Sequence, residues 1–324
     1  MTDNTPIETD AETPETDPAG SIEAAHDVAI AVRDNVEAVM VGKRETVEHT
    51  LTAILAGGHV LLEDVPGVGK TMLARAIAGS VDGDFKRVQF TPDLLPSDVT
   101  GVNVFDQTTR EFEFRPGPIF ANVVLGDEIN RAPPKTQSAL LEAMEEEQVT
   151  VDGESHAVPD PFTVVATQNT VEGDSAYDLP LAEIDRFMKT LELGYPDQEQ
   201  ERDLLQRVSG RHPIEDLSPV ASLADLRAAR RTTAGMTASE EIRDYVTRLA
   251  AHTRESARLG VSPRGSIALL RAARARALLD GRSYVVPHDV QTEARVVLPH
   301  RIRTGDERTG ADLVADALAT VDVE

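Results

Sequence analysis

An apolar run, a glycine-rich turn and a helical pattern follow one another within one short stretch of this chain. The run begins at Val60, the turn reads Asp64-Val-Pro-Gly-Val-Gly-Lys-Thr71, and Met72-Leu-Ala-Arg-Ala-Ile-Ala78 follows. A buried strand, a tight loop and a helix start in that order direct loop N–H groups and the positive end of the helix toward one place. The stretch therefore predicts a phosphate cradle, in which Lys70 reaches the β- and γ-phosphates and the Thr71 hydroxyl ligates Mg²⁺.

The loop departs from the usual phosphate-binding pattern at one position. That pattern opens with glycine, and Asp64 stands there instead. Glycines later in the loop still relieve the bend, so we expect nucleotide contacts along its length. The expected contact residues are Pro66, Gly67, Val68, Gly69, Lys70, Thr71 and Met72. The alternative is a glycine-rich turn between a strand and a helix that holds no nucleotide.

A second apolar run, Val123-Val-Leu-Gly, ends in the adjacent carboxylates Asp127 and Glu128. Ligands of open α/β sheets bind at the carboxyl ends of the strands. We therefore expect Asp127 to hold the Mg²⁺ that Thr71 also ligates, and Glu128 to accept a proton from the attacking water. Gly126 is interpreted as making room for the phosphate loop. The alternative is a pair of acids that cap a surface helix.

Three more polar residues follow predicted elements. Asn169 ends the run that begins at Thr163, where it could orient the water or contact the γ-phosphate, or simply form a turn. Arg186 lies on a short predicted helix, and its alternative is an ordinary surface charge. Ser262 can cap a predicted helix, and Pro263 lies in its first turn. Arg264 projects from this helix start, and it too could have no function.

Composition excludes several classes of protein. The 324 residues include no cysteine, which rules out disulfides and thiolate metal sites. The first residues have no charged-then-apolar leader and no run is long enough to span a membrane, so we expect a cytoplasmic protein without membrane insertion. Asp and Glu outnumber Lys and Arg by 56 to 32, and the net charge of −24 would repel nucleic acid unless a local basic groove existed. An acidic partner role and an acidic tail are alternatives, but we favour a surface adapted to a high-salt cytoplasm.

The pattern along the chain predicts three parts. Residues 1–20 are an acidic tail, expected to be disordered and solvated. Residues 21–195 alternate short strands with helices at 71–79, 136–147 and 181–188, which predicts an α/β domain with a largely parallel sheet and helices on both faces. Two hairpins, at 102–114 and 148–158, interrupt this alternation. Residues 196–324 predict a second, all-helical domain.

Together these residues resemble an AAA+ ATPase, and the longer motifs are similar to those of the MoxR branch. The phosphate loop at 64–71, the carboxylates at 127–128, Asn169, Arg186 and Arg264 follow the family's order. The longer motifs, Gln89–Gly101, Gly117–Phe120, Asp127–Glu146, Ala166–Asn169 and Leu179–Met188, extend the resemblance, which covers nearly everything from residue 22 to Arg303.

The resemblance implies an AAA+ P-loop αβα domain followed by a helical lid, with ATP and Mg²⁺ as cofactors. It assigns Asn169 to sensor 1, Arg264 to sensor 2 and Arg186 to the arginine finger that reaches a neighbouring subunit's ATP. Val41 and Gly42 resemble the segment that contacts adenine. The two hairpins resemble the helix-2 insert and the pre-sensor-1 hairpin, which usually face the pore of the ring.

The implied function is an ATP-hydrolysing motor in a ring of identical subunits, expected to be a hexamer. It would act as a chaperone on a client protein complex, with a von Willebrand A-domain protein as an expected partner. Alternatives are a chelatase-type metal-insertion motor, a nucleic-acid-acting AAA+ ATPase, and an ATP-binding scaffold that never hydrolyses. The acidic hairpin tips disfavour the nucleic-acid alternative, and intact Glu128, Asn169 and Arg186 disfavour the scaffold.

Overall fold

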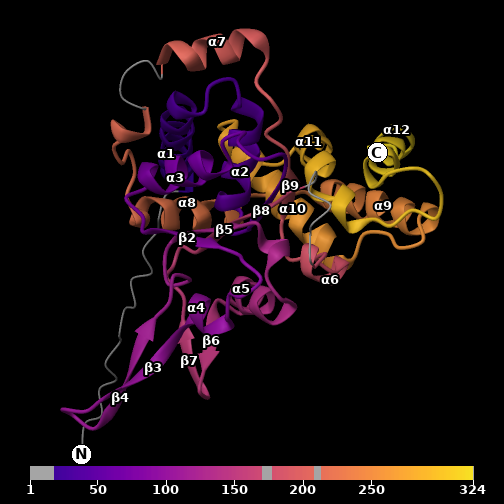
Figure 1. Cartoon of the computed structure of the whole chain (residues 1–324). Helices are drawn as coiled ribbons and strands as arrows, with labels where there is room; N and C mark the ends of the chain where they lie inside the picture. The colour runs from indigo at the N-terminus through magenta and orange to yellow at the C-terminus, as the bar shows by residue number, and fades with distance from the viewer. Residues whose placement is uncertain (1–17, 170–176, 208–212, 324) are drawn as a thin grey trace, which may run out of the picture.

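A computed structural model describes residues 18–169, 177–207 and 213–323 (Figure 1). Helix α1 (Pro18–Val39) begins inside the segment expected to be the acidic tail, and residues 1–17 of that tail lie outside the described residues. Among the described helices, none is long and apolar enough to cross a membrane.

The centre of the fold is a five-stranded parallel sheet, as the alternating pattern predicts. Its spatial order is β2-β5-β8-β1-β9, with Val60 opposite both Val165 and Lys189. The strands are β1 (Val60–Glu63), β2 (Phe85–Gln89), β5 (Val123–Asp127), β8 (Thr163–Gln168) and β9 (Lys189–Leu191). The chain leaves β1 toward β2 on one side and returns to β9 on the other, so β1 lies at the switch point where such sheets bind ligands.

Successive residues of a strand point to opposite faces, and the buried residues divide accordingly into two cores. Leu62, Leu125 and Val165 belong to one core, whereas Leu61 and Val124 belong to the other. The strands β5 and β8 are buried on both sides, which explains their almost uninterrupted apolar runs. The first core also contains residues of the C-terminal helices, so those helices share apolar packing with the sheet domain.

Helices α1, α2 (Arg44–Leu55) and α3 (Lys70–Ser80) cover the first face, together with α8 (Leu223–Gly235) and α10 (Pro263–Leu279). Helices α4 (Pro96–Thr100) and α5 (Pro134–Glu146) lie on the other face (Figure 1). The remaining helices are α6 (Leu181–Ile184), α7 (Gln198–Arg207), α9 (Glu240–Ser256), α11 (Pro287–Val297) and α12 (Gly310–Thr320). Beyond β9, the described residues form helices and no further strand of the named elements, as predicted for residues 196–324.

The helix expected at 181–188 ends early, at Ile184. Met188 N–H donates to the His59 carbonyl (2.9 Å), and Lys189 begins β9 beside β1. Pairing with the sheet therefore prevents the helical pattern from continuing.

Buried charges tie the C-terminal helices to the sheet. Glu293 on α11 is fully buried, and its carboxylate pairs with Lys189 of β9 and with Arg276 of α10 (3.0 Å). Lys189 also donates to Thr52 of α2 (2.5 Å), and burial lowers its pKa to about 8 despite the attraction of Glu293. A charge group of this kind holds α2, β9, α10 and α11 in one arrangement, because separating any member would leave a buried charge unpaired.

Both expected hairpins form, and they project together from the sheet domain (Figure 1). The first pairs β3 (Gly101–Asp106) with β4 (Glu111–Pro116), and the second pairs β6 (Gln148–Val151) with β7 (Glu154–Ala157). Asn103 donates to Asp152 (3.0 Å) and Phe114 stacks on His156, so the hairpins support each other.

Candidate nucleotide site

The phosphate loop runs from β1 into α3 as predicted. Gly67 and Gly69 have φ values of 85° and 105°, a region that favours glycine, and Gly69 precedes the first residue of α3. The Lys70 ammonium donates to the Asp64 carbonyl (2.8 Å) and to Asn169 Oδ1 (3.2 Å). Burial lowers the pKa of Lys70, and the carboxylates of Asp64, Asp127 and Glu128 act in the opposite direction. These carboxylates therefore support a cation at the bottom of the loop.

The two carboxylates at the end of β5 are held differently. Asp127 accepts from the Thr167 hydroxyl (2.6 Å) and from Arg87 Nε–H (3.1 Å). Glu128 has a φ of 58°, a left-handed conformation that is uncommon for a residue with a side chain. Strained backbone of this kind is concentrated at functional sites.

Three donors orient the Glu128 carboxylate. They are Asn169 Nδ2 (3.0 Å), Gln89 Nε2 (2.7 Å) and Arg131 Nη1 (2.8 Å). Asn169 thus connects Lys70 to Glu128, and the structure brings together the polar residues predicted from β1, β5 and β8. Gln89 and Arg131 complete this group; sequence reasoning quoted both within motifs but assigned neither a role.

A continuous cleft runs along the phosphate loop. One part, about 380 Å³, is lined by residues of the loop and of the carboxylate group: Pro66, Gly67, Gly69, Lys70, Thr71, Met72, Arg87, Gln89, Asp127, Glu128 and Asn169. The other part, about 430 Å³, shares Pro66, Gly67, Gly69 and Met72 and extends to Val41 and Val68. Its remaining walls include Met40, Tyr195, Pro196, Gln200 and Leu204. A polar part and a more apolar part joined along one loop suit the triphosphate and the base of a nucleotide.

Sequence reasoning missed the wall formed by Tyr195, Gln200 and Leu204. Gly42 does not line the cleft, but Gln200 Nε2 donates to its carbonyl (3.4 Å). These residues lie at the start of the C-terminal region, so the expected domain boundary at 195 passes through the cleft. The signal available in the sequence was the aromatic-proline pair Tyr195-Pro196 shortly before an acidic helix.

Two charged side chains form hydrogen bonds to the linker between β9 and α7 (residues 192–197), which contains Tyr195 and Pro196 of this wall. Asp64 Oδ2 accepts from the backbone N–H groups of Leu193 (2.7 Å) and Gly194 (2.6 Å). Lys43 donates to the carbonyls of Leu193 (2.6 Å), Gly194 (3.0 Å) and Tyr195 (3.1 Å). The aspartate that replaces the usual glycine therefore connects the phosphate loop to the linker.

Gly126 has a different role from the one expected. A Cβ at this position would lie 3.1 Å from Leu140 Cδ2 and 3.3 Å from Phe90 Cε2. The missing side chain therefore makes room for α5 and the second core rather than for the phosphate loop. The interpretation from sequence was wrong because the position of Gly126 next to Asp127 in the sequence does not show which face of the sheet Gly126 lies on.

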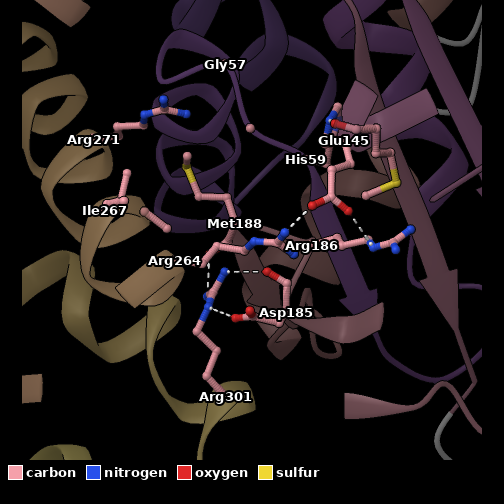
Figure 2. A pocket seen from close by; sticks show the side chains of 13 residues that line it. Gly57, His59, Glu145, Asp185, Arg186, Met188, Arg264, Ile267, Arg271 and Arg301 are labelled. Carbon is pink, nitrogen blue, oxygen red and sulfur yellow. Dashed lines mark hydrogen bonds and ion pairs between the residues drawn. The ribbon is translucent and has the colours of Figure 1, made fainter. Parts of the chain in front are cut away.

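Arg186 and Arg264 do not reach this cleft. They line a separate cavity of about 180 Å³ with Gly57, His59, Glu145, Met188 and Arg271, and the two cavities share no lining residue (Figure 2). Glu145 of α5 forms ion pairs with both guanidinium groups, one of them between Arg186 Nε and Oε2 (3.1 Å). The structure thus brings the two arginines to each other but keeps both away from the phosphate loop of their own chain.

The turn that carries Arg186 is fixed by the residue before it. Asp185 accepts from Arg301 Nε–H (2.7 Å) and from the Ser262 hydroxyl (3.3 Å). Arg301, which is almost fully buried, also donates to the Phe187 carbonyl (2.7 Å). Ser262 caps α10 as predicted and accepts from Gly265 N–H (3.2 Å). The two arginines therefore project from a rigid support that spans the sheet domain and the C-terminal helices.

The candidate cation ligands are few. Among the described residues, no group of three or more His, Asp or Glu could hold a metal by itself. Thr71 and Asp127 both line the phosphate part of the cleft and offer the hydroxyl and carboxylate oxygens that Mg²⁺ accepts. This donor set fits a cation that is completed by phosphate oxygens and water, as in other phosphate-loop sites.

Comparisons with known proteins give two family models that match parts of this chain. A model of the ATPase family associated with various cellular activities (AAA) matches residues 59–189, and an AAA lid domain model matches residues 249–317. The chain is 41% identical to Chaperone MoxR1 of Mycobacterium tuberculosis over 82% of this chain and 73% of that protein. It is 53% identical to the uncharacterised YeaC of Bacillus subtilis, covering 88% and 90% of the two chains.

A solved structure extends the likeness to the fold. The crystal structure of an ATPase candidate from Cytophaga hutchinsonii superimposes with a TM-score of 0.87 at 37% identity, and the alignment covers 94% of this chain and 97% of the other.

Proposed function

This chain belongs to the MoxR family of AAA+ ATPases, and on that premise we propose that it hydrolyses ATP at sites shared between identical copies. The observation that carries this proposal is the separation of two half-sites. One half holds Lys70 and Glu128, and the other holds Arg186 and Arg264 in a cavity that shares no residue with the first. A single chain therefore offers a place for the nucleotide, with Lys70 in the cleft, but without the guanidinium groups of Arg186 and Arg264.

In this proposal the phosphate loop binds the triphosphate. Lys70 and the N–H groups of residues 67–72 hold the phosphates, while Val41, Met72 and Tyr195 enclose the base. Thr71 and Asp127 would hold Mg²⁺, which neutralises phosphate charge when bound. Arg87 pairs with Asp127 in this structure, so it would have to share that carboxylate with a bound cation or release it.

Glu128 is the proposed proton acceptor for the attacking water. Its carboxylate lies at the mouth of the same cleft as Lys70 and is oriented by three donors. Phosphoryl transfer needs a positioned water and neutralised oxygens rather than covalent chemistry. Asn169, which contacts both Lys70 and Glu128, is suited to set the position of that water relative to the γ-phosphate.

The arginines of one copy would complete the site of the next. Arg186 Nε–H is buried and, among the described residues, lacks an aligned hydrogen-bond acceptor, so its contact with Glu145 is an ion pair only. The Arg186 side chain as a whole is 29% exposed, so the remaining N–H groups of its guanidinium are available to a phosphate oxygen of another copy. Repeating the head-to-tail contact produces a closed ring, and a hexamer is the expected size.

We infer that hydrolysis drives a chaperone-like remodelling of a client protein complex. The β3–β4 hairpin exposes Phe112 (71%) and Phe105 (49%), whose rings lie 5.3 Å apart. Exposed aromatic pairs of this kind mark interaction sites, and the neighbouring hairpin supports them. A von Willebrand A-domain protein remains the proposed partner in this assembly.

Three variants test the shared site. Arg186→Ala should retain nucleotide affinity, measured by calorimetry, and lose about 10³-fold or more of the phosphate-release rate. Lys70→Ala should lose nucleotide binding, and Glu128→Gln should bind ATP but turn it over slowly. Arg308→Ala, which removes only a surface pair with Asp306, is the matched arginine control. Full turnover by Arg186→Ala would refute the proposed division of the site.

A further inference from the structure

A single carboxylate, Glu145, serves both arginines of the second cavity. One of its oxygens lies 3.1 Å from Arg186 Nε and the other pairs with Arg264 Nη2. Figure 2 shows the carboxylate between the two guanidinium groups. The Glu145 side chain is 33% exposed, so it lies at the cavity rim rather than in the core.

The two arginines come from different parts of the chain, whose backbones Asp185 already connects through Arg301 and Ser262. Arg186 follows α6 in the sheet domain, whereas Arg264 is the second residue of α10 in the C-terminal helices. Glu145 lies on a third element, close to the C-terminal end of α5. Its carboxylate therefore joins three elements at the point where the arginines emerge.

No other carboxylate lining the cavity can take this place. The second acidic residue there, Asp185, is engaged by Arg301 and Ser262. Arg271 adds another positive charge to the same lining. Glu183, which does not line the cavity, attracts Arg186, but no carboxylate of the lining other than Glu145 pairs with both guanidinium groups. Without Glu145 the neighbouring guanidinium groups would therefore repel each other.

We propose that Glu145 is a positioning residue that holds Arg186 and Arg264 as one unit for the neighbouring copy's γ-phosphate. Each guanidinium has five N–H donors, so each can keep one contact with Glu145 and present the rest outward. Pre-arranged donors avoid the ordering cost that flexible arginines would pay in the transition state. This inference rests on the proposed function, in which the two arginines act on another copy's nucleotide.

The test uses two full-length subunit types that are inactive alone. Type X carries Lys70→Ala and keeps its arginines, while type Y keeps its phosphate loop and carries Arg186→Ala with Arg264→Ala. Mixing X and Y should restore ATP hydrolysis at the contacts where X arginines meet Y nucleotide. Glu145→Gln, which keeps side-chain size and removes the charge, is then placed in either X or Y. Glu146→Gln, at the next and exposed position of α5, is the matched control.

Glu145→Gln in X should lower the phosphate-release rate of the mixture about tenfold or more, because it disorders the donors that act on Y. The same change in Y should leave the rate within about twofold, because the Y arginines are already absent. An unchanged rate with the change in X, or equal losses in X and Y, would overturn the inference, since equal losses indicate a folding effect. If the X and Y mixture is inactive although wild-type protein hydrolyses ATP, the shared-site proposal fails instead.

Discussion

Restoring the usual glycine of the phosphate loop should destabilise this protein. Asp64 is only 7% exposed, and its carboxylate accepts from the N–H groups of Val65, Leu193 and Gly194 at 2.6–2.7 Å. Among the described residues of the loop, positive φ values occur at Gly67 and Gly69 but not at Asp64. Glycine at position 64 would therefore relieve no backbone strain and would remove the contact between the loop and the linker.

The magnitude follows from the donors that lose their acceptor. Asp64→Gly leaves the Leu193 and Gly194 N–H groups unpaired at about 1–3 kcal/mol each. Glycine adds about 0.5–1 kcal/mol through the greater freedom of the unfolded chain. Relief from burying a carboxylate offsets part of this, so we expect a net loss of about 3 kcal/mol. Asp64→Asn keeps an oxygen for the two linker donors and should lose about 1 kcal/mol.

Urea unfolding at high salt measures the free energy of unfolding of wild type, Asp64→Gly and Asp64→Asn under identical conditions. The expected order of stability is wild type, then Asn, then Gly. Calorimetry should also show weaker ATP binding by the glycine variant, because the linker carries Tyr195 of the base pocket. A glycine variant within about 1 kcal/mol of wild type would refute this reasoning.

Four further outcomes are expected. Glu293→Gln should cost about 3–5 kcal/mol in urea unfolding because it leaves the fully buried Lys189 unpaired. Lys189→Met with Glu293→Leu should recover only part of this loss, because Arg276 then keeps Glu48 alone as its partner. Burial lowers the pKa of His59 from 6.5 to about 4. Between these pH values the unfolded chain therefore binds a proton at His59, whereas the folded chain does not. His59 alone should therefore lower stability by up to about 3 kcal/mol as pH drops from 6.5 to 4, and His59→Gln should reduce the fall in stability over that range. Gly126→Val should cost about 2 kcal/mol by crowding Leu140. Transfer from molar salt to about 0.1 M should lower the unfolding midpoint, because a net charge of −24 repels itself when screening is weak; an unchanged midpoint would contradict the salt-adapted interpretation.

Much of the candidate site follows from local pattern. The apolar runs before Asp64 and before Asp127 each form a buried parallel strand, and parallel strands bring their carboxyl ends to one edge. This rule alone brings Lys70, Asp127, Glu128 and Asn169 together, because each follows or ends a strand. The hairpin around Asp152-Gly153 and the helix after Pro263 likewise depend on local turn and cap chemistry, and both are confirmed.

Other features depend on contacts between distant segments. Gly126 faces Phe90 and Leu140, which is decided by the face that the strand presents to α5. Asp64 acts on Leu193 and Gly194, about 130 residues away. Lys43 and Tyr195 meet at the base pocket for the same reason. No periodicity or spacing in a single sequence reports such pairs, because their distance along the chain carries no information about their distance in space.

The amino-acid sequence by itself determined the order of strands and helices, the phosphate loop and the residues that can bind a nucleotide, since these depend on neighbours within one turn or one strand. Only the tertiary structure decided which residues share a cavity. It separated Arg186 and Arg264 from the phosphate loop and brought both to Glu145, because packing of the C-terminal helices against the first face of the sheet sets where α10 begins. Because of this packing, the polar residues of the sequence lie in two separate half-sites.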